Sequence, residues 1–266
     1  MRYVDQGRGD PVVFVHGIVS DHRVWNAHLQ FISARVRCIA YDQRYFGEID
    51  WPKDGPEYSV ATHADDLAGF LAEVVQCPAH IVGWSYGGAV ALAMTAAKPE
   101  TVKSLCLYEA AGLFSVITDP KQLAAIANER SGMAPIAEAA AKGELVAAAK
   151  QAAEWTEGVP DSFNSLPREV QKVVLENAHT LKRHFSAPPS KVTCADLHAV
   201  SVPVTLMWGS DTRPFFSIFA NAIGRCLANV EYMVLPGVRH FAPVQNPDLF
   251  ALSLLAHLDR CGAAAK

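Results

Sequence analysis

Short runs of apolar residues alternate along the chain with longer stretches whose apolar positions recur at helical spacing. Most of these runs are continuously apolar and rich in β-branched residues, as expected for strands buried on both faces of a parallel sheet. We predict strands at Val12–His16, Val36–Tyr41, His80–Trp84, Lys103–Tyr108, Pro203–Trp208 and Val230–Leu235. We expect one more strand, Arg2–Asp5, at an edge of the sheet.

The helical stretches lie between these runs. We predict helices over Ser59–Val75, Tyr86–Ala97, Phe215–Leu227 and Pro247–Leu258, with Ser59 as the N-cap of the first. Strands that alternate with helices are typical of an α/β protein, in which helices flank a mostly parallel sheet.

The alternation is interrupted once, between residues 109 and 203. Residues 119–157 contain 13 alanines in 39 positions, and a second helical stretch runs from Pro167 to His184. Further α/β units with unrecognised strands would also fill this gap. Nearly ninety residues without a convincing strand favour a helical cap at residues 112–200, inserted into a core formed by residues 1–111 and 201–266.

Composition narrows the classes of protein that remain. The chain has 266 residues, half of them hydrophobic, and a formal net charge of −4. This balance excludes a disordered chain and argues against a nucleic-acid partner, which would favour a basic surface. No signal peptide is visible, and no apolar run approaches the roughly 18–20 residues that span a bilayer. We therefore expect a cytoplasmic protein with no membrane partner, as a monomer or homodimer.

The six cysteines are scattered, and no two form a C-x-x-C pair. This spacing excludes a zinc ribbon. Several cysteines lie in or beside apolar runs, so we expect reduced, buried thiols and no metal site.

The segment from Gly83 to Gly87, Gly-Trp-Ser-Tyr-Gly, carries the strongest chemical signal. This G-x-S-x-G pattern follows a predicted strand directly and precedes a predicted helix, which is the setting of a nucleophilic serine. The two glycines remove Cβ atoms that would collide across so tight a turn. We predict Ser85 as the nucleophile, although an incidental serine in a tight turn would also satisfy the bare pattern.

Two other strand ends supply partners for Ser85. His16 and Gly17 follow the strand Val12–Val15, so the amide of Ile18 can join that of Tyr86 in an oxyanion hole. His16 itself is interpreted as a structural residue. His240 follows the last predicted strand, where an imidazole can reach the serine and act as general base and acid.

These elements occur in the order found in the α/β-hydrolase fold superfamily, which the chain resembles over nearly its whole length. The resemblance rests on His16-Gly17, Asp42-Gln43-Arg44, the Ser85 turn and the His240 loop. The loop from Arg44 to Ile49 departs from the family pattern, and the usual first strand is missing. Because the fold supports many chemistries, it does not identify the substrate.

Two carboxylates compete for the third place of a catalytic triad. The usual family position follows the second-last strand, where Thr212 stands and Asp211 comes one residue early. Glu109 ends the strand before it, and a subset of the superfamily similar to zearalenone-type lactonases takes its acid from there. A charged residue that ends so apolar a strand also needs a partner. We favour Glu109 and keep Asp211 as the alternate.

The resemblance implies a serine hydrolase without a cofactor, acting on a small-molecule carboxylic ester or lactone through an acyl-enzyme. A nucleophilic serine argues against the epoxide hydrolases and haloalkane dehalogenases of this fold, which use aspartate. C–C bond hydrolysis, amidase and perhydrolase activity remain open, as does a ligand-binding receptor that retains the triad. We expect the substrate pocket to include Trp84, Phe46, Trp155 and His22.

Overall fold

The computed structural model describes residues 1–52 and 54–263. Its centre is a seven-stranded sheet in the order β1-β3-β2-β4-β5-β6-β7, in which only β1 runs antiparallel to its neighbour. The strands are β1 (Tyr3–Gln6), β2 (Pro11–Val15), β3 (Arg37–Tyr41), β4 (Ala79–Trp84), β5 (Val102–Tyr108), β6 (Val204–Gly209) and β7 (Val230–Leu235). Every strand predicted from the apolar runs is present, including the edge strand.

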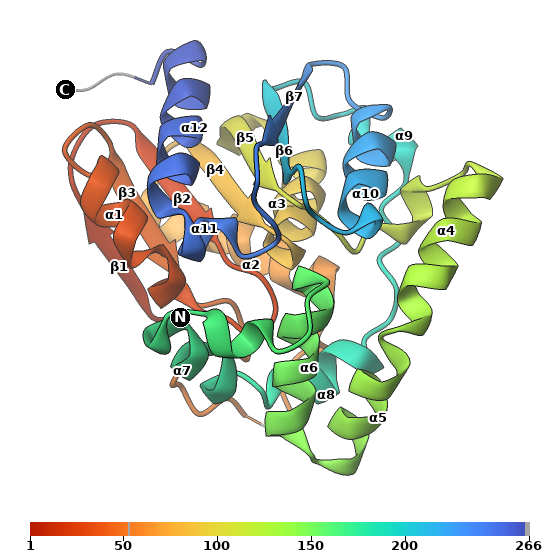
Figure 1. Cartoon of the computed structure of the whole chain (residues 1–266). Coiled ribbons are helices and arrows are strands. Elements are labelled where there is room, and N and C mark those ends of the chain that lie inside the picture. Colours follow the sequence, from red (N-terminus) through yellow and green to blue (C-terminus); the bar gives the residue numbers. More distant parts are fainter. Residues whose placement is uncertain (53, 264–266) are drawn as a thin grey trace.

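Helices cover both faces of this sheet, as Figure 1 shows. On one face α1 (Asn26–Ile32) packs against α12 (Pro247–Arg260), and on the other α2 (Val60–Phe70) packs against α3 (Tyr86–Ala97). Strands β2 and β4 are buried along their whole length, which explains why they contain no polar alternation. The predicted α/β fold with a mostly parallel sheet is therefore confirmed.

The helix ends show where local sequence decided the structure and where packing did. The Ser59 hydroxyl accepts the amide of Thr62 at 3.1 Å and so begins α2, which continues into a wider turn over Leu71–Val75. Helix α1 was not predicted. It is short, and its stability comes from the burial of residues such as Leu29 and Ile32.

A helical insertion separates β5 from β6, as the long strand-free segment predicted. It contains α4 (Pro120–Ser131), α5 (Ala134–Lys142), α6 (Leu145–Glu157), α7 (Arg168–Glu176), α8 (Thr180–Ser186) and α9 (Cys194–Leu197). Figure 1 shows α6, α7 and α8 lying beyond the carboxyl ends of the strands. Four of the five alanines of α6 are buried, and their small side chains let α5 and α6 pack closely.

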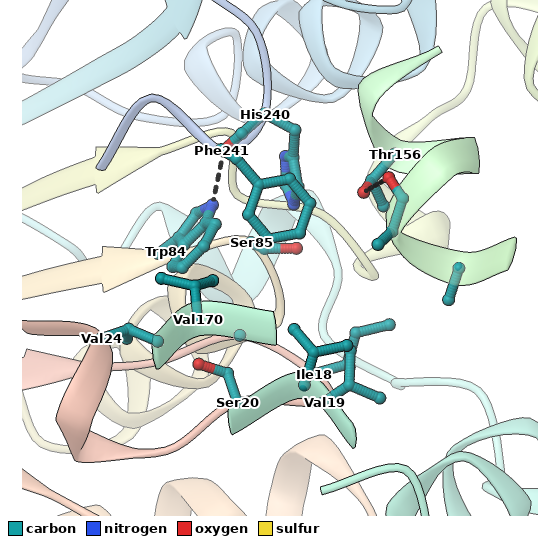
Figure 2. A pocket seen from close by; sticks show the side chains of 14 residues that line it. Ile18, Val19, Ser20, Val24, Trp84, Ser85, Thr156, Val170, His240 and Phe241 are labelled. Carbon is teal, nitrogen blue, oxygen red and sulfur yellow. Dashed lines mark hydrogen bonds between the residues drawn. The ribbon is translucent and has the colours of Figure 1, made fainter. Parts of the chain in front are cut away.

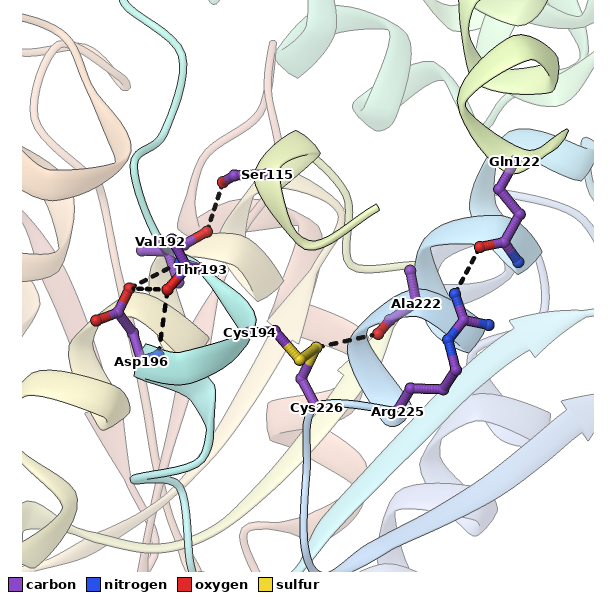
Figure 3. The surroundings of a disulfide bond; sticks show 9 residues. All are labelled: Ser115, Gln122, Val192, Thr193, Cys194, Asp196, Ala222, Arg225 and Cys226. Carbon is purple, nitrogen blue, oxygen red and sulfur yellow. Dashed lines mark hydrogen bonds between the residues drawn. A yellow bond between two sulfur atoms is a disulfide. The ribbon is translucent and has the colours of Figure 1, made fainter. Parts of the chain in front are cut away.

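The cysteines differ from expectation at one disulfide pair and at Cys77, which is exposed, whereas Cys38 and Cys106 are buried free thiols as expected. Cys194 and Cys226 form a disulfide with their Cα atoms 4.9 Å apart, so these two thiols are not reduced (Figure 3). The bond joins α9 to the chain just after α10 (Pro214–Gly224). Thirty-two positions separate the two residues, and only the packing of α9 and α10 reveals that they meet. None of the helices in the described part of the chain has the length and apolar character that crossing a bilayer requires.

Candidate active site

Ser85 stands in a strained turn between β4 and α3. Its backbone has φ 56° and ψ −121°, a conformation that costs free energy for any residue with a Cβ. Three hydrogen bonds hold the turn: the Ser85 amide donates to Tyr108 O at 2.9 Å, and Ser85 O accepts the amides of Gly88 at 3.0 Å and Ala111 at 3.3 Å. The turn therefore presents Ser85 at the carboxyl edge of the sheet, at the first turn of a helix.

Glycine at two positions allows this edge to assemble. A Cβ at Gly87 would lie 2.3 Å from Val15 O and 2.4 Å from His16 O, so only glycine lets α3 approach the end of β2 so closely. A Cβ at Gly17 would lie 3.2 Å from the Ser85 Cβ. The loop after β2 is thus in direct contact with the proposed nucleophile.

Hydrogen bonds of His16 orient that loop. The Gln43 amide donates to Nε2 of His16 at 3.1 Å, so the other ring nitrogen, Nδ1, carries the proton and donates to Gly17 O at 2.8 Å. In a trans peptide the N–H points opposite to the C=O, so the amide of Ile18 points away from His16. Tyr86 is the first residue of α3, and its amide has no partner within the helix. Ile18 lines the same cavity as Ser85, and Tyr86 follows Ser85 directly, so their amides stay the predicted oxyanion donors.

His240 is held on several sides in the loop after β7. Its Nδ1 lies 2.6 Å from Oε2 of Glu109, and Phe216 of α10 stacks on its ring at 4.2 Å between centroids. Trp84 Nε1 donates to the carbonyl of His240 at 3.1 Å. Because Nδ1 is occupied, Nε2 is the nitrogen available to Ser85. Figure 2 shows the side chains of Ser85 and His240 at the same cavity.

Glu109 follows β5 directly and is fully buried. Its backbone has φ 48°, a left-handed conformation that turns the side chain across the end of β6. There Oε1 accepts the amide of Gly209 at 3.0 Å while Oε2 contacts His240. Both oxygens therefore have partners, as a buried carboxylate requires.

Asp211, the alternate acid, lies elsewhere. It is exposed, and its Oδ1 accepts the hydroxyl of Ser210 at 2.8 Å. Its backbone carbonyl accepts the guanidinium of Arg239. Of the two carboxylates weighed from the sequence, the structure brings Glu109 to the imidazole and leaves Asp211 at the surface turn.

A small, mostly apolar cavity of about 20 Å³, the Ser85 cavity, adjoins the serine and the histidine. Core and cap both line it (Figure 2): Gly17, Ile18, Val19, Ser20, Val24, Trp84, Ser85, His240 and Phe241 come from the core, and Ala152, Ala153, Thr156, Val170 and Val174 from α6 and α7. None of these cap residues was predicted from the sequence. The alanine-rich segment was the available signal, since small side chains leave room over a site.

Of the expected pocket residues, Trp84 lines the Ser85 cavity and the other three lie elsewhere. Phe46 is fully buried against the ring of His16, 4.9 Å away. Trp155 points into a separate cavity of the cap, under the guanidinium of Arg213. His22 is buried with Nδ1 2.6 Å from Oδ1 of Asp42. Phe46, Trp155 and His22 therefore contact neighbouring aromatic or charged groups instead of the Ser85 cavity.

Asp21, His22 and Asp42 bring metal-binding atom types within 4.8 Å of one another. Each residue already has protein partners. Asp21 accepts Arg23 and Asn177, while Asp42 accepts both the amide and the imidazole of His22. These contacts join the loop after β2 to the loop after β3 and to the cap. We interpret the cluster as a structural hydrogen-bond network that connects these two loops and the cap.

Three known proteins show what this chain is similar to. BpoC of Mycobacterium tuberculosis, a proposed non-heme bromoperoxidase, is 32% identical over 114 residues, which cover 42% of each chain. The matched region thus spans less than half the length of this curated relative. A thermophilic esterase of Thermogutta terrifontis has a TM-score of 0.70 at 23% identity, over 98% of this chain and 93% of the esterase. The enol-lactonase of Burkholderia xenovorans LB400 has a TM-score of 0.77 at 18% identity, over 97% and 96%.

The similarity to these two structures shows a shared fold. A comparison of the sequence with family profiles shows the family. The sequence profile of the alpha/beta hydrolase family matches residues 12–252, which includes the Ser85 turn, the insertion and the His240 loop. The chain therefore belongs to the alpha/beta hydrolase family.

Proposed function

We propose that this protein is a serine hydrolase that cleaves a carboxylic ester or lactone through an acyl-enzyme, without a cofactor. One observation carries the proposal: a buried Glu109 carboxylate lies 2.6 Å from His240 Nδ1, and His240 shares a cavity with Ser85 in a strained strand–helix turn. This arrangement generates a serine nucleophile with an oriented base.

The reaction proceeds in two balanced steps. His240 Nε2 takes the Ser85 proton as Oγ bonds to the carbonyl carbon, and the amides of Ile18 and Tyr86 stabilise the oxyanion. When the intermediate collapses, the C–O bond to the leaving alcohol breaks and His240 returns the proton to that oxygen. Water then attacks the acyl-enzyme, again through His240, and releases the acid and Ser85. Glu109 stabilises the imidazolium in both steps.

Substrate entry requires the cap to move. The Ser85 cavity, about 20 Å³, has room for little more than one water molecule. A second cavity of about 550 Å³, the outer cavity, lies between α2, α3 and the cap. Tyr86, the residue directly after the proposed nucleophile, is part of its lining. Apolar and aromatic side chains such as Tyr58, Phe114 and Phe185 dominate its lining. We assign the outer cavity to the larger, apolar part of the substrate.

Similarity in fold to an esterase and an enol-lactonase supports ester or lactone cleavage. A fluorophosphonate probe tests the proposal, because it bonds covalently to an activated serine. Rapid labelling of Ser85, absent in Ser85→Ala, is expected, as is turnover of p-nitrophenyl esters or of aliphatic and macrocyclic lactones. Ser85→Ala should lower that turnover by several orders of magnitude while the fold is retained. An unlabelled wild-type protein that cleaves none of these substrates would contradict the proposal and favour a ligand-binding protein.

A further inference from the structure

A carboxylate from the cap reaches the loop that carries His240. Glu157 is the last residue of α6, and only 3% of its surface is exposed. Its Oε1 accepts the backbone amide of Phe241 at 2.6 Å. Phe241 is the residue directly after His240, so this hydrogen bond joins the cap to the chain that holds the proposed base.

Burial of the Glu157 carboxylate costs free energy unless neighbouring charges and hydrogen-bond donors compensate it. Desolvation raises the pKa of the Glu157 carboxyl, while the Phe241 amide and the charge of His240 act in the opposite direction. The other charged groups that face it are Glu109 and Arg239. His240 therefore lies in the field of two carboxylates, Glu109 on its Nδ1 and Glu157 across the next peptide.

The Glu157 bond connects two bodies that must separate. Helix α6 also supplies Ala152, Ala153 and Thr156 to the wall of the Ser85 cavity. If that wall opens to admit a substrate, the end of α6 is displaced and the carboxylate is withdrawn from Phe241. Closing the wall restores a short, buried, charge-assisted hydrogen bond, which is among the stronger kinds in proteins.

We propose that Glu157 is a positioning residue that couples closure of the cap to the alignment of His240. The inference rests on the proposed hydrolase function. In the closed state the carboxylate fixes the Phe241 amide and adds negative charge near the imidazolium. In the open state the His240 loop loses this support, so the base is aligned only when the substrate is enclosed and bulk water is excluded.

Two substitutions separate the two contributions of Glu157. Glu157→Gln keeps an oxygen that can accept the amide but removes the charge, whereas Glu157→Ala removes both. Glu154→Gln and Glu154→Ala are matched controls, because Glu154 lies on α6 and lines the separate cavity beside Trp155. Ester hydrolysis is measured against pH, and hydrogen exchange is followed at the Phe241 amide.

We expect Glu157→Ala to lower kcat by about tenfold or more, with a smaller change in KM, since a charge-assisted hydrogen bond is lost. Glu157→Gln should move the acid limb of the pH profile to lower pH by about half a unit, because removal of a negative charge disfavours the imidazolium. Exchange of the Phe241 amide should accelerate in Glu157→Ala. The Glu154 variants should behave as wild type in all three measurements.

The proposal is overturned if Glu157→Ala retains kcat within twofold and the Phe241 amide exchanges at the wild-type rate. It is also overturned if the Glu157 variants are merely less stable, with full kcat per folded molecule and an unmoved acid limb. If Glu157→Ala does not fold, the acid limb of Glu157→Gln decides. If the wild type cleaves no ester, the proposed function fails, and exchange at the Phe241 amide in Glu157→Ala, compared with Glu154→Ala, still decides the coupling to the cap.

Discussion

Replacing Glu109 by glutamine exchanges one carboxylate oxygen for an NH₂ group at the centre of the proposed site. The carboxylate contacts His240 Nδ1 at 2.6 Å, and both side chains are almost completely buried. In Glu109→Gln an oxygen can still accept the amide of Gly209, so the local fold is retained. The amide NH₂ would then face Nδ1, which favours the wrong imidazole tautomer and leaves the imidazolium without its counter-charge.

The size of the effect follows from Coulomb's law. Two unit charges about 4 Å apart interact by about 4 kcal/mol at an effective dielectric constant of about 20. Because about 1.36 kcal/mol corresponds to tenfold in rate, loss of this interaction from the transition state predicts a decrease of about a thousandfold in kcat. The pair is buried, so solvent screening reduces this value little.

The assay is steady-state hydrolysis of a p-nitrophenyl ester, with circular dichroism and thermal unfolding to establish that the variant is folded. Asp211→Asn is the matched control. Asp211 is exposed and contacts Ser210, so its neutralisation should change kcat by less than about threefold. A larger loss in Asp211→Asn than in Glu109→Gln would refute the assignment and place the acid after β6.

Three further results are expected. Ala137→Trp, which narrows the outer cavity, should lower kcat/KM for long-chain esters about tenfold more than for acetate esters, and the same change at exposed Ala127 should not; equal losses would contradict our assignment of that cavity. Burial lowers the pKa of both His63 and His257 to about 3, so the unfolded chain binds more protons below about pH 6.5; thermal unfolding should show stability falling from that pH towards pH 3, and a constant melting temperature would contradict this. Reduction of the Cys194–Cys226 disulfide should lower the free energy of unfolding in urea by about 3 kcal/mol, and unchanged stability after complete reduction would show that the bond is dispensable.

Local sequence patterns determined most of the fold. The strands β2 to β6 appear where continuous apolar runs occur, because strands buried on both faces cannot include a polar face, whereas β7 is a largely exposed edge strand. The Ser59 cap is also local, since its hydrogen bond joins residues three positions apart, whereas the Gly-Trp-Ser-Tyr-Gly turn has a local sequence signal but is held partly by contacts with β2 and β5. The helical insertion was visible for the same reason, as a long segment without any strand pattern.

The tertiary structure decided which side chains from distant parts of the sequence contact one another. The sequence left Glu109 and Asp211 as competing acids, and only the left-handed turn after β5 shows which carboxylate contacts His240. The sequence also did not reveal the cap residues of the Ser85 cavity, the Cys194–Cys226 bond or the contact of Glu157 with the His240 loop. Periodicity reports which face of an element is buried, but it carries no information on which side chain from another element fills the space against it. That choice depends on the packing of the whole chain.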